Sequence, residues 1–454
     1  PGMVRSKEMA KEEPGMVRSK EMAKEEPGMV RSKEMAKEEP GMVRNELVEL
    51  KGDGAIAASA GEERLVLEGG LQPFILRTSS GALVLQAQLP EKPYPSERMV
   101  FHSKIATVIS RDGGMSWERF ERRPGENDVN MEGGAIQLAA GSILALDTYI
   151  TPVPGKPDAG AGELYVSIDD WRSLEGPVPV TFHMPGAVFT GSTDDGGEAH
   201  QAQRLHRSIV ALPGGDLLAC GYGWLQGDTE PAPYMTTMKK SWTLMFRSRN
   251  MGKHWELVST IDLSPKPGTE GLVEPALVRL SGGRREGRLL CMIRTGRELY
   301  EAHSDDDGAT WSAARPVDFG VVDIYREEEW ADMFAGMLDK HGQPVELTGA
   351  FVDPELLELR SGALVCAFGV RIPARACWPK PDHPWNGNYL AVSLDQGETW
   401  SHVYRLTSGV LTTHYMAIAE IAEDELFVAY DFGDWENKRG RYTYGRTVKF
   451  DIRR

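Results

Sequence analysis

A pair of apolar segments separated by a short polar turn occurs six times along this chain. Each copy begins with a polar residue, continues through an apolar segment, turns near a Gly or an acidic residue, and returns through a second apolar segment. The copies cover residues 72–88, 132–149, 206–223, 274–294, 353–371 and 414–431. Because both arms are short, apolar and bounded by turn residues, each copy predicts two paired β-strands.

The spacing of the copies predicts how these strand pairs assemble. Their starts fall roughly 60 to 80 residues apart, which leaves room for two further strands in each unit. A four-stranded unit that repeats radially is a blade of a β-propeller. We therefore predict an all-β protein, a single six-bladed propeller of four-stranded blades over residues 63–454. Residues 63–68 are expected to complete the last blade and so join the two ends of the domain.

A second repeat lies between the strand pairs and has the pattern Ser-x-Asp-x-Gly-x-Thr/Ser-Trp. It is complete at residues 304–311 and 393–400, nearly complete at 110–117, and shortened or altered at 248–255 and 167–171. In such a turn the Asp side chain accepts hydrogen bonds from backbone N–H groups, and Gly takes the positive φ angle. These turns are Asp boxes, and with them the chain resembles the sialidase superfamily of six-bladed propellers. The resemblance covers roughly residues 63 to 454.

Polar residues open the predicted inner strands and close their partners, although the strands themselves are apolar. The opening residues are Gln72, Glu132, His206 with Arg207, Glu274, Asp353, and His414 with Tyr415, and the closing residues include Asp147, Arg294 and Arg371. All are expected at one mouth of the propeller. Such a ring of charged and polar groups predicts a binding site for a polar ligand.

Three of these residues match the sialidase pattern. Glu274 opens an inner strand, Arg294 closes its partner in the same blade, and Tyr415 opens the last inner strand. The resemblance implies that Tyr415 is the nucleophile, Glu274 the base that activates it, and Arg294 a clamp for a substrate carboxylate. A neutral phenol suits an anionic sugar, because the carboxylate of the sugar would repel a charged nucleophile. Sialidases accordingly use Tyr and depart from the two-carboxylate scheme. A phenol titrates near pH 10, so it requires an adjacent base.

Two positions depart from that family. Gln72-Pro73-Phe74 stands where sialidases carry Arg-Ile-Pro, and the stretch that should hold the acid Asp offers Glu91, Glu97 and Arg98 instead. We expect Arg207, Arg294 and Arg371 to form a substitute arginine cluster, and Glu132 or Asp147 to supply the acid. The further expected ligand contacts are His206, His414, Asp353, Gln72 and Trp385. Trp385 and Trp378 lie in a loop after Arg371, and Trp330 lies in a segment that predicts a short helix over the same face.

Three functions are consistent with this sequence. The first is a sialidase-like exo-glycosidase that removes a terminal, acidic sugar. The second is a uronate lyase acting by β-elimination, with His206, His414 or Tyr415 as base and Arg294 or Arg371 neutralising the carboxylate. The third is a non-catalytic carbohydrate-binding propeller. A carbohydrate is the expected partner in each case.

Composition limits the partners and the cellular location that we expect for this protein. The 51 basic and 67 acidic residues give a net charge of −16, which disfavours nucleic acids and anionic membranes. The four cysteines have no metal-ligand spacing, and we predict no metal and no cofactor. No apolar run reaches membrane-spanning length and the N-terminus has no signal-peptide core, so we expect a cytoplasmic protein.

The N-terminal residues form a separate repeat. The segment PGMVRSKEMAKEE occurs three times without change, and PGMVR begins a fourth copy at Pro40. Pro-Gly every 13 residues interrupts any helix that Lys, Glu, Met and Ala favour. We interpret residues 1–41 as a tail that arose by tandem duplication or cloning, and residues 42–62 as a linker.

Overall fold

A computed structural model describes residues 46–89, 104–120, 129–189, 191–192, 200–233, 238–437 and 439–453. The chain divides into two compact units, Pro1–Val43 and Arg44–Arg454. The first unit, and with it the predicted N-terminal tail, lies outside the described residues. Everything below concerns the second unit.

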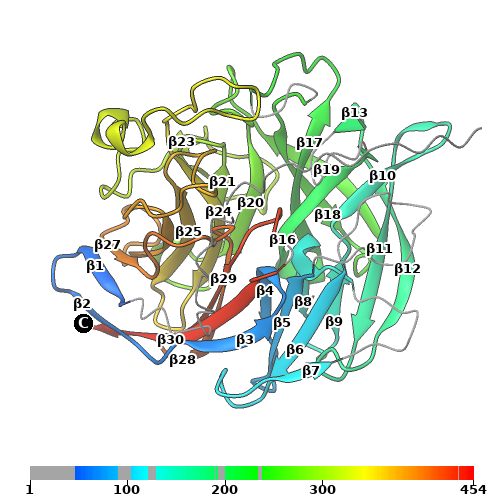
Figure 1. Ribbon diagram of the computed structural model, residues 1–454. Helices are drawn as coiled ribbons and strands as arrows, with labels where there is room; N and C mark the ends of the chain where they lie inside the picture. Colours follow the sequence, from blue (N-terminus) through cyan, green and yellow to red (C-terminus); the bar gives the residue numbers. More distant parts are fainter. Residues whose placement is uncertain are drawn as a thin grey trace, which may run out of the picture. The chain divides into compact units, whose positions relative to one another are not determined.

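Four groups of strands form separate antiparallel sheets (Figure 1). The first contains β4 (Leu71–Arg77), β5 (Leu83–Gln88), β6 (Ile105–Ser110) and β7 (Glu118–Phe120). The second contains β20 (Val273–Arg279), β21 (Leu289–Arg294), β22 (Tyr300–Ser304) and β23 (Arg315–Pro316). The third contains β24 (Ala350–Glu358), β25 (Leu364–Arg371), β26 (Gly387–Ser393), β27 (His402–Arg405) and β1 (Val48–Lys51). The fourth contains β28 (Met416–Ala422), β29 (Glu425–Phe432), β30 (Tyr442–Ile452), β2 (Ile56–Ala60) and β3 (Arg64–Glu68).

The two remaining repeats form one closed ring of eight strands. The ring contains β8 (Ala135–Gln137), β9 (Ile143–Leu146), β11 (Lys156–Ser167), β12 (Glu175–His183), β16 (Gln203–Ala211), β17 (Leu217–Leu225), β18 (Trp242–Ser248) and β19 (His254–Ile261). Strands β10 (Tyr149–Val153) and β13 (Ala187–Val188) pair with its members, and β14 (Gly191–Ser192) pairs with β15 (His200–Gln201) apart from it. The prediction of six separate blades is therefore wrong, since the structure has four blades and this ring.

Strand length explains the ring. Strand β11 has 12 residues and β12 has 9, so the outer strand continues far enough to meet its neighbour. Strand β12 pairs in parallel with β19, Phe182 lying opposite Trp255, and a single pair, Ser208 with Ala135, joins β16 to β8. An unpaired outer edge offers free N–H and C=O groups to any strand within reach. The strands of the second and third repeats are therefore paired along both of their edges, β12 with β19 and β8 with β16.

Hydrophobic packing follows the six sequence repeats more closely than hydrogen bonding does. Six buried clusters of the described residues lie between successive repeats, one between each repeat and the next, and the last repeat packs on the first. The cluster that closes this series includes Leu85 and Phe427. Inside the ring, the Phe182 and Phe246 rings meet edge to face with centroids 5.4 Å apart. The apolar arms identified from the sequence therefore make the core.

The predicted closure of the last blade is confirmed. Leu65 pairs with Tyr444 and Leu67 pairs with Thr443, which places β3 against β30. Residues 42–62 are not simply a linker where the structure describes them, because β2 pairs with the other half of β30 and β1 pairs with β27. Both are short outer strands of mixed polarity, so their sequence carries no clear alternation.

The repeated Ser-x-Asp turns share one hydrogen-bond pattern. Asp306 accepts from the Thr310 amide at 2.8 Å, and Asn250 of the altered turn accepts from the His254 amide at 2.9 Å. In the shortened turn, Trp171 stands where the other turns have Gly and adopts φ 69°, with its ring fully buried. The cost of that backbone conformation is offset by packing of the indole in the core.

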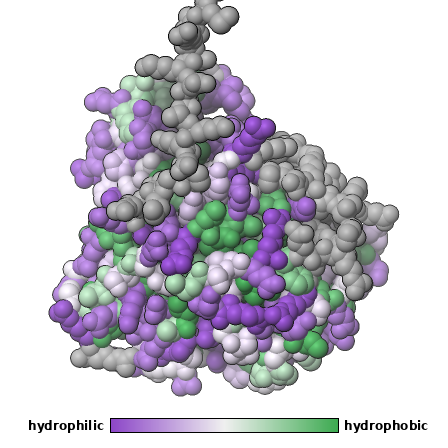
Figure 2. Space-filling model, turned by 60° about the horizontal axis from the view of Figure 1, so that its bottom comes forward, coloured by the Kyte–Doolittle hydropathy of each residue, from purple (hydrophilic) through white to green (hydrophobic). Residues whose placement is uncertain are grey.

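On the face shown in Figure 2, hydrophobic residues lie in small groups among hydrophilic ones. Among the described residues, no helix is both long and apolar enough to cross a membrane.

Candidate functional site

The innermost strands carry a backbone irregularity at the polar residues that open the repeats. The pairing register shifts within β4, β16, β20 and β24. At these shifts Gln72, Arg207, Glu274 and Asp353 adopt φ angles of 53°, 56°, 44° and 48°, and His414 adopts 71° just before β28. A left-handed conformation costs a residue other than Gly about 1–3 kcal/mol, and it persists only where the surroundings impose it. Such bulges redirect a side chain out of the sheet alternation.

Tyr415, Glu274 and Arg294 lie together, as their positions in the repeats predict. The Tyr415 hydroxyl donates to Glu274 Oε1 at 2.6 Å. Arg294 Nη1 donates to Glu274 Oε2 at 2.8 Å and to the Tyr415 oxygen at 3.0 Å. Glu274 lies on β20, Arg294 ends β21, and Tyr415 precedes β28, so two sheets meet at this contact.

The surroundings shift the pKa values of Glu274 and Tyr415 in opposite directions. Burial would raise the pKa of Glu274, but the charges of Arg294 and His206 and the hydrogen bond from Tyr415 lower it to about 2. Burial and the charge of Glu274 raise the pKa of Tyr415 well above its usual value. At neutral pH Tyr415 is therefore a neutral phenol hydrogen-bonded to an ionised carboxylate.

Glu270 belongs to the same group, although the sequence analysis missed it. Arg294 Nη2 donates to Glu270 Oε1 at 2.8 Å, and both side chains are 7 % exposed. Glu270 lies on the loop before β20, outside the strand openings on which the prediction was based. Arg294 is thus held between two carboxylates, which fixes the direction of its guanidinium group.

Arg207 forms ion pairs with three carboxylates at the centre of the domain. Its guanidinium contacts Asp353 Oδ2 at 3.0 Å and Glu355 Oε2 at 3.1 Å, and it donates to the Met416 carbonyl at 2.6 Å. A longer contact of 3.7 Å reaches Glu132 Oε1. The Arg207 side chain is only 1 % exposed, so its guanidinium group bonds to protein atoms and hardly meets solvent. Burial lowers the pKa of Arg207, but the carboxylates of Asp353, Glu355 and Glu132 outweigh burial and raise it.

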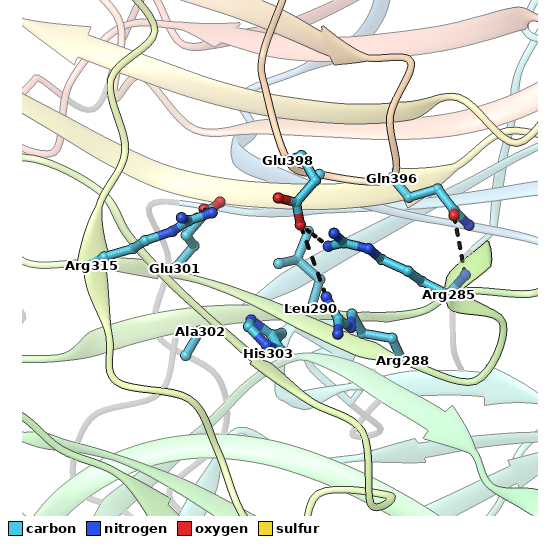
Figure 3. Close-up of a pocket in the computed structure, with 10 residues that line it drawn as sticks. Arg285, Arg288, Leu290, Glu301, Ala302, His303, Arg315, Gln396 and Glu398 are labelled. Atoms are coloured by element: carbon cyan, nitrogen blue, oxygen red, sulfur yellow. Dashed lines mark hydrogen bonds and ion pairs between the residues drawn. The ribbon is translucent and has the colours of Figure 1, made fainter. Parts of the chain in front are cut away.

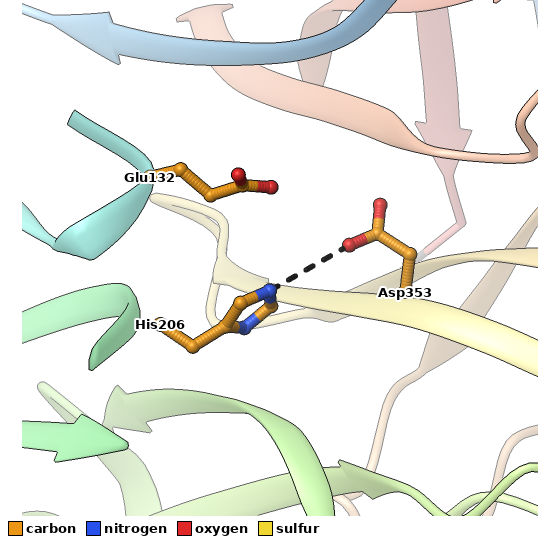
Figure 4. Close-up of side chains that lie close together, drawn as sticks. All are labelled: Glu132, His206 and Asp353. Atoms are coloured by element: carbon orange, nitrogen blue, oxygen red, sulfur yellow. Dashed lines mark ion pairs between the residues drawn. The ribbon is translucent and has the colours of Figure 1, made fainter. Parts of the chain in front are cut away.

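Glu132, His206 and Asp353 lie close together (Figure 4). Arg207 contacts both carboxyl groups. His206 Nε2 is 4.0 Å from Asp353 Oδ1, and one carboxylate oxygen of Glu132 completes a group of three atoms within 4.8 Å of one another. Burial lowers the pKa of His206 to about 4. Burial raises the pKa of both carboxyl groups, more than Arg207 lowers it.

Glu132 is held differently from the other opening residues. It was expected at the start of an inner strand but lies on the 3₁₀ turn η1 (Met131–Gly133), where Asn130 accepts from its amide at 3.1 Å. Gln88 Nε2 donates to Glu132 Oε2 at 3.1 Å and to Gln72 Oε1 at 3.0 Å. The predicted contacts Gln72 and Glu132 are therefore joined through Gln88.

Other predicted residues form contacts with residues outside this cluster. Arg371 donates to the Thr413 carbonyl at 2.8 Å and its guanidinium lies 4.9 Å from the centre of the Trp378 ring. His414 is fully buried, and its Nε2 contacts Asn386 Oδ1 at 3.2 Å. Asp147 is buried just after β9.

The tryptophans of the loops expected over the mouth are partly used for packing. Trp385 is half-buried with the Arg405 guanidinium 5.9 Å from its ring centre. Trp330 is 2 % exposed and its Nε1 donates to the Leu347 carbonyl at 2.7 Å. The segment around Trp330 forms two 3₁₀ turns, η4 (Glu327–Glu329) and η5 (Asp332–Phe334), instead of the expected short helix. Glu91, Glu97 and Arg98 lie outside the described residues.

Hollows in the described part of the chain also lie away from this cluster. A cavity of about 10 Å³ lies between the second and third separate sheets, where Arg285 and Arg288 both pair with Glu398 (Figure 3). Arg288 also pairs with Asp305. A groove of about 580 Å³ runs beside it over Lys51, Arg315 and Trp400. The Asp305 side chain is 61 % exposed and that of Glu398 45 %, so water screens these ion pairs. The central cluster, which is buried and where charges converge, is the better candidate site.

Comparisons with known proteins agree on the fold. The sequence matches no protein-family model and no curated protein. A solved protein of unknown function from Dyadobacter fermentans is similar over 87 % of this chain and 99 % of its own, with 15 % identity and a TM-score of 0.57. The α-L-arabinofuranosidase of Fusarium graminearum is similar over 86 % of this chain and 98 % of its own, with 11 % identity and a TM-score of 0.52.

A sialidase is also among the similar structures. The NanB sialidase of Streptococcus pneumoniae matches 84 % of this chain and 70 % of its own, with 12 % identity and a TM-score of 0.48. At these identities the comparisons show a propeller-like fold. They assign no role to any residue of this chain.

Proposed function

We propose that this protein is a glycoside hydrolase that removes a terminal acidic sugar, with Tyr415 as nucleophile. The observation that carries the proposal is the 2.6 Å hydrogen bond from Tyr415 to Glu274, with Arg294 bonded to both. A hydroxyl nucleophile needs an adjacent base within about 2.6–3.2 Å and a third group that orients the base. A glycosidase with a similar fold supports the same class of reaction.

The proposed reaction has two steps. Tyr415 Oη bonds to the anomeric carbon, its proton passes to Glu274, and the bond to the leaving oxygen breaks as a general acid protonates that oxygen. Water then attacks the anomeric carbon and gives a proton to the former acid, while Tyr415 leaves and regains its proton from Glu274. Glu132 and Asp147 remain the two predicted acids, and the raised pKa of Glu132 suits an acid.

Arg294 would make the activation of Tyr415 depend on an acidic sugar. In the free protein this guanidinium holds Glu274 ionised and of low basicity. A substrate carboxylate that bonds to Arg294 would compete with Glu274 for it. Glu274 would then become a stronger base when the substrate is present, and proton transfer from Tyr415 would become easier.

Product analysis tests the proposal. The full chain is incubated with a panel of oligosaccharides that end in sialic or uronic acids, with neutral arabinosides as the contrast. Release of the free acidic sugar without an unsaturated product supports the proposal. An ultraviolet-absorbing unsaturated uronate would replace it with β-elimination, and binding without any bond change would replace it with a carbohydrate-binding function.

A further inference from the structure

We propose that Glu132, His206 and Asp353 form a binding site for one divalent metal ion of the zinc type. No spacing in the sequence predicts this site, because the three residues come from three different repeats and meet at the centre. Carboxylate oxygens and an imidazole nitrogen are ligands that zinc and similar transition metals accept.

The histidine presents a free nitrogen to this group. His206 Nδ1 lies 3.0 Å from the Pro275 carbonyl, which can only accept, so Nδ1 carries the proton and Nε2 has a lone pair. Nε2 is buried without a hydrogen-bond partner, and so is Asp353 Oδ1, 4.0 Å away. His206 is 4 % exposed and Asp353 fully buried. Buried polar atoms are almost always paired, so two facing acceptors indicate that a cation belongs between them.

The second contacts of these ligands already orient them. A metal-binding histidine usually donates its other nitrogen to a carbonyl or carboxylate, as His206 does to Pro275. Asp353 Oδ2 accepts from the Met416 amide at 3.0 Å and contacts Arg207, which leaves Oδ1 for the ion. Gln88 holds one oxygen of Glu132. Pro275, Met416 and Gln88 thus orient the three ligands, while Arg207 approaches Glu132 Oε1 at 3.7 Å.

Charge also favours a cation here. The ion pairs at the centre join five carboxylates, those of Glu132, Glu270, Glu274, Asp353 and Glu355, to two guanidinium groups, those of Arg207 and Arg294. Buried carboxylates in excess of their partners are costly. One divalent ion offsets part of this burial cost.

The geometry is close to that of an occupied site. Ligand atoms at about 2.0–2.2 Å from a tetrahedral zinc stand about 3.4 Å apart. The three atoms here lie within 4.8 Å of one another, so the side chains must close by about 1 Å on binding. Three protein ligands leave a fourth position open for water or a ligand oxygen.

The role of the ion rests on the proposed function. The chain has Gln72 where sialidases place their leading arginine. A metal ion beside Gln72 and Glu132 supplies positive charge for a substrate carboxylate in its place. As a ligand Glu132 stays ionised, so the general acid is then Asp147.

Zinc binding to the full chain tests the site without reference to activity. The protein is freed of metal with a chelator, dialysed, and titrated with Zn²⁺ by calorimetry, with Ca²⁺ as the contrast because it prefers oxygen ligands. We expect one Zn²⁺ per chain, weaker Ca²⁺ binding, and a rise in Tm with Zn²⁺. Loss of a residue that merely orients a ligand costs about 10–100-fold in affinity, so His206→Gln should weaken Zn²⁺ binding by at least about 100-fold.

His183→Gln is the matched control, since His183 is exposed on β12, and it should bind Zn²⁺ like the unchanged protein. Glu132→Gln provides a second variant if His206→Gln fails to fold. Co²⁺ absorption in the visible range, present in the unchanged protein and absent in either site variant, would support nitrogen and oxygen ligation at this place. Failure to bind Zn²⁺, or equal binding by the unchanged protein and both site variants, would overturn the metal site. Zinc binding with no glycosidase activity would keep the site and reject only the proposed function.

Discussion

Tyr415 and Glu274 are separated by 141 residues in the sequence and by 2.6 Å between their oxygen atoms. Each precedes or opens an innermost strand, and the two strands belong to different sheets. A phenol whose pKa is raised by burial thus donates to a carboxylate whose pKa is about 2. At neutral pH this arrangement keeps the proton on Tyr415.

Tyr415→Phe should remove most of the proposed glycosidase activity while leaving the fold intact. The substitution deletes the nucleophilic oxygen, and activation of a nucleophile by a base accounts for about 10²–10⁴-fold in rate. We expect a fall in kcat/KM of at least about 100-fold. Tyr430→Phe is the control, because Tyr430 is also buried and its hydroxyl also bonds a carboxylate, that of Glu63. Equal activity of the two variants would refute a role for Tyr415 as nucleophile.

Arg294→Met should move the acid limb of the pH–rate profile to higher pH. Burial raises the pKa of Glu274 and the charge of Arg294 lowers it, so removing that charge lets the pKa rise above about 2. Glu274 is then ionised, and able to act as base, only at higher pH. Measuring kcat/KM from acid to neutral pH checks this, and an unmoved acid limb would show that Glu274 is not the base.

Arg207→Met should strongly destabilise the protein. It leaves Asp353, Glu355 and Glu132 without their common partner at the centre. Breaking a buried ion pair from one side costs about 3–5 kcal/mol. Arg249→Ala, which breaks an ion pair between side chains that are 59 % and 42 % exposed, should cost about 0–1 kcal/mol. Urea unfolding measures both, and a small loss for Arg207→Met would mean that water reaches these carboxylates.

Glu355→Gln should alter how stability depends on pH. Burial raises the pKa of Glu355 from 4.5 to about 7, so its contribution to stability is complete below pH 4.5 and is lost as pH rises to about 7. The uncharged Gln does not titrate. The free energy of unfolding of Glu355→Gln should therefore rise relative to the unchanged protein between those pH values, by up to about 3 kcal/mol.

Glu358→Gln is the control for that change, since Glu358 lies on the same strand and is only partly buried. Unfolding by urea at several pH values between 4 and 8 provides the comparison. Parallel pH curves for Glu355→Gln and the unchanged protein would mean that the pKa of Glu355 is the same in the folded and the unfolded protein.

Asp306→Ala should lower stability through the loss of a turn. Asp306 accepts from the Thr310 amide at 2.8 Å and from the Thr310 hydroxyl at 2.6 Å. Loss of a side-chain hydrogen bond in such a turn costs about 1 kcal/mol. Asp306→Asn should lose less, because Asn250 makes the equivalent amide contact in another turn of this chain. Thermal unfolding ranks the two variants, and equal Tm values for both would contradict the stated role of the side-chain oxygen.

Patterns within the sequence determined the strands and the polar residues at their openings. Apolar arms around each turn predict strand pairs, and the six repeats predict six packing interfaces, because both depend on neighbours along the chain or on the same unit one repeat later. The meeting of Tyr415, Glu274 and Arg294 follows from the same reasoning, since each stands at an equivalent end of a strand. The raised pKa of Glu355 has no such local origin.

Tertiary structure alone decided the remaining features. The eight-stranded ring depends on how far β11 and β12 extend and on which edges they reach. Residues 48–51 and 56–60 become strands only because β27 and β30 present open edges to them. Glu270 lies on a loop, and its contact with Arg294 depends on how that loop folds back. His206 and Asp353 face each other because bulges in two strands turn the side chains toward one point. Hydrogen-bonded edges and buried charges depend on distances between remote segments, and no local pattern of residues encodes those distances.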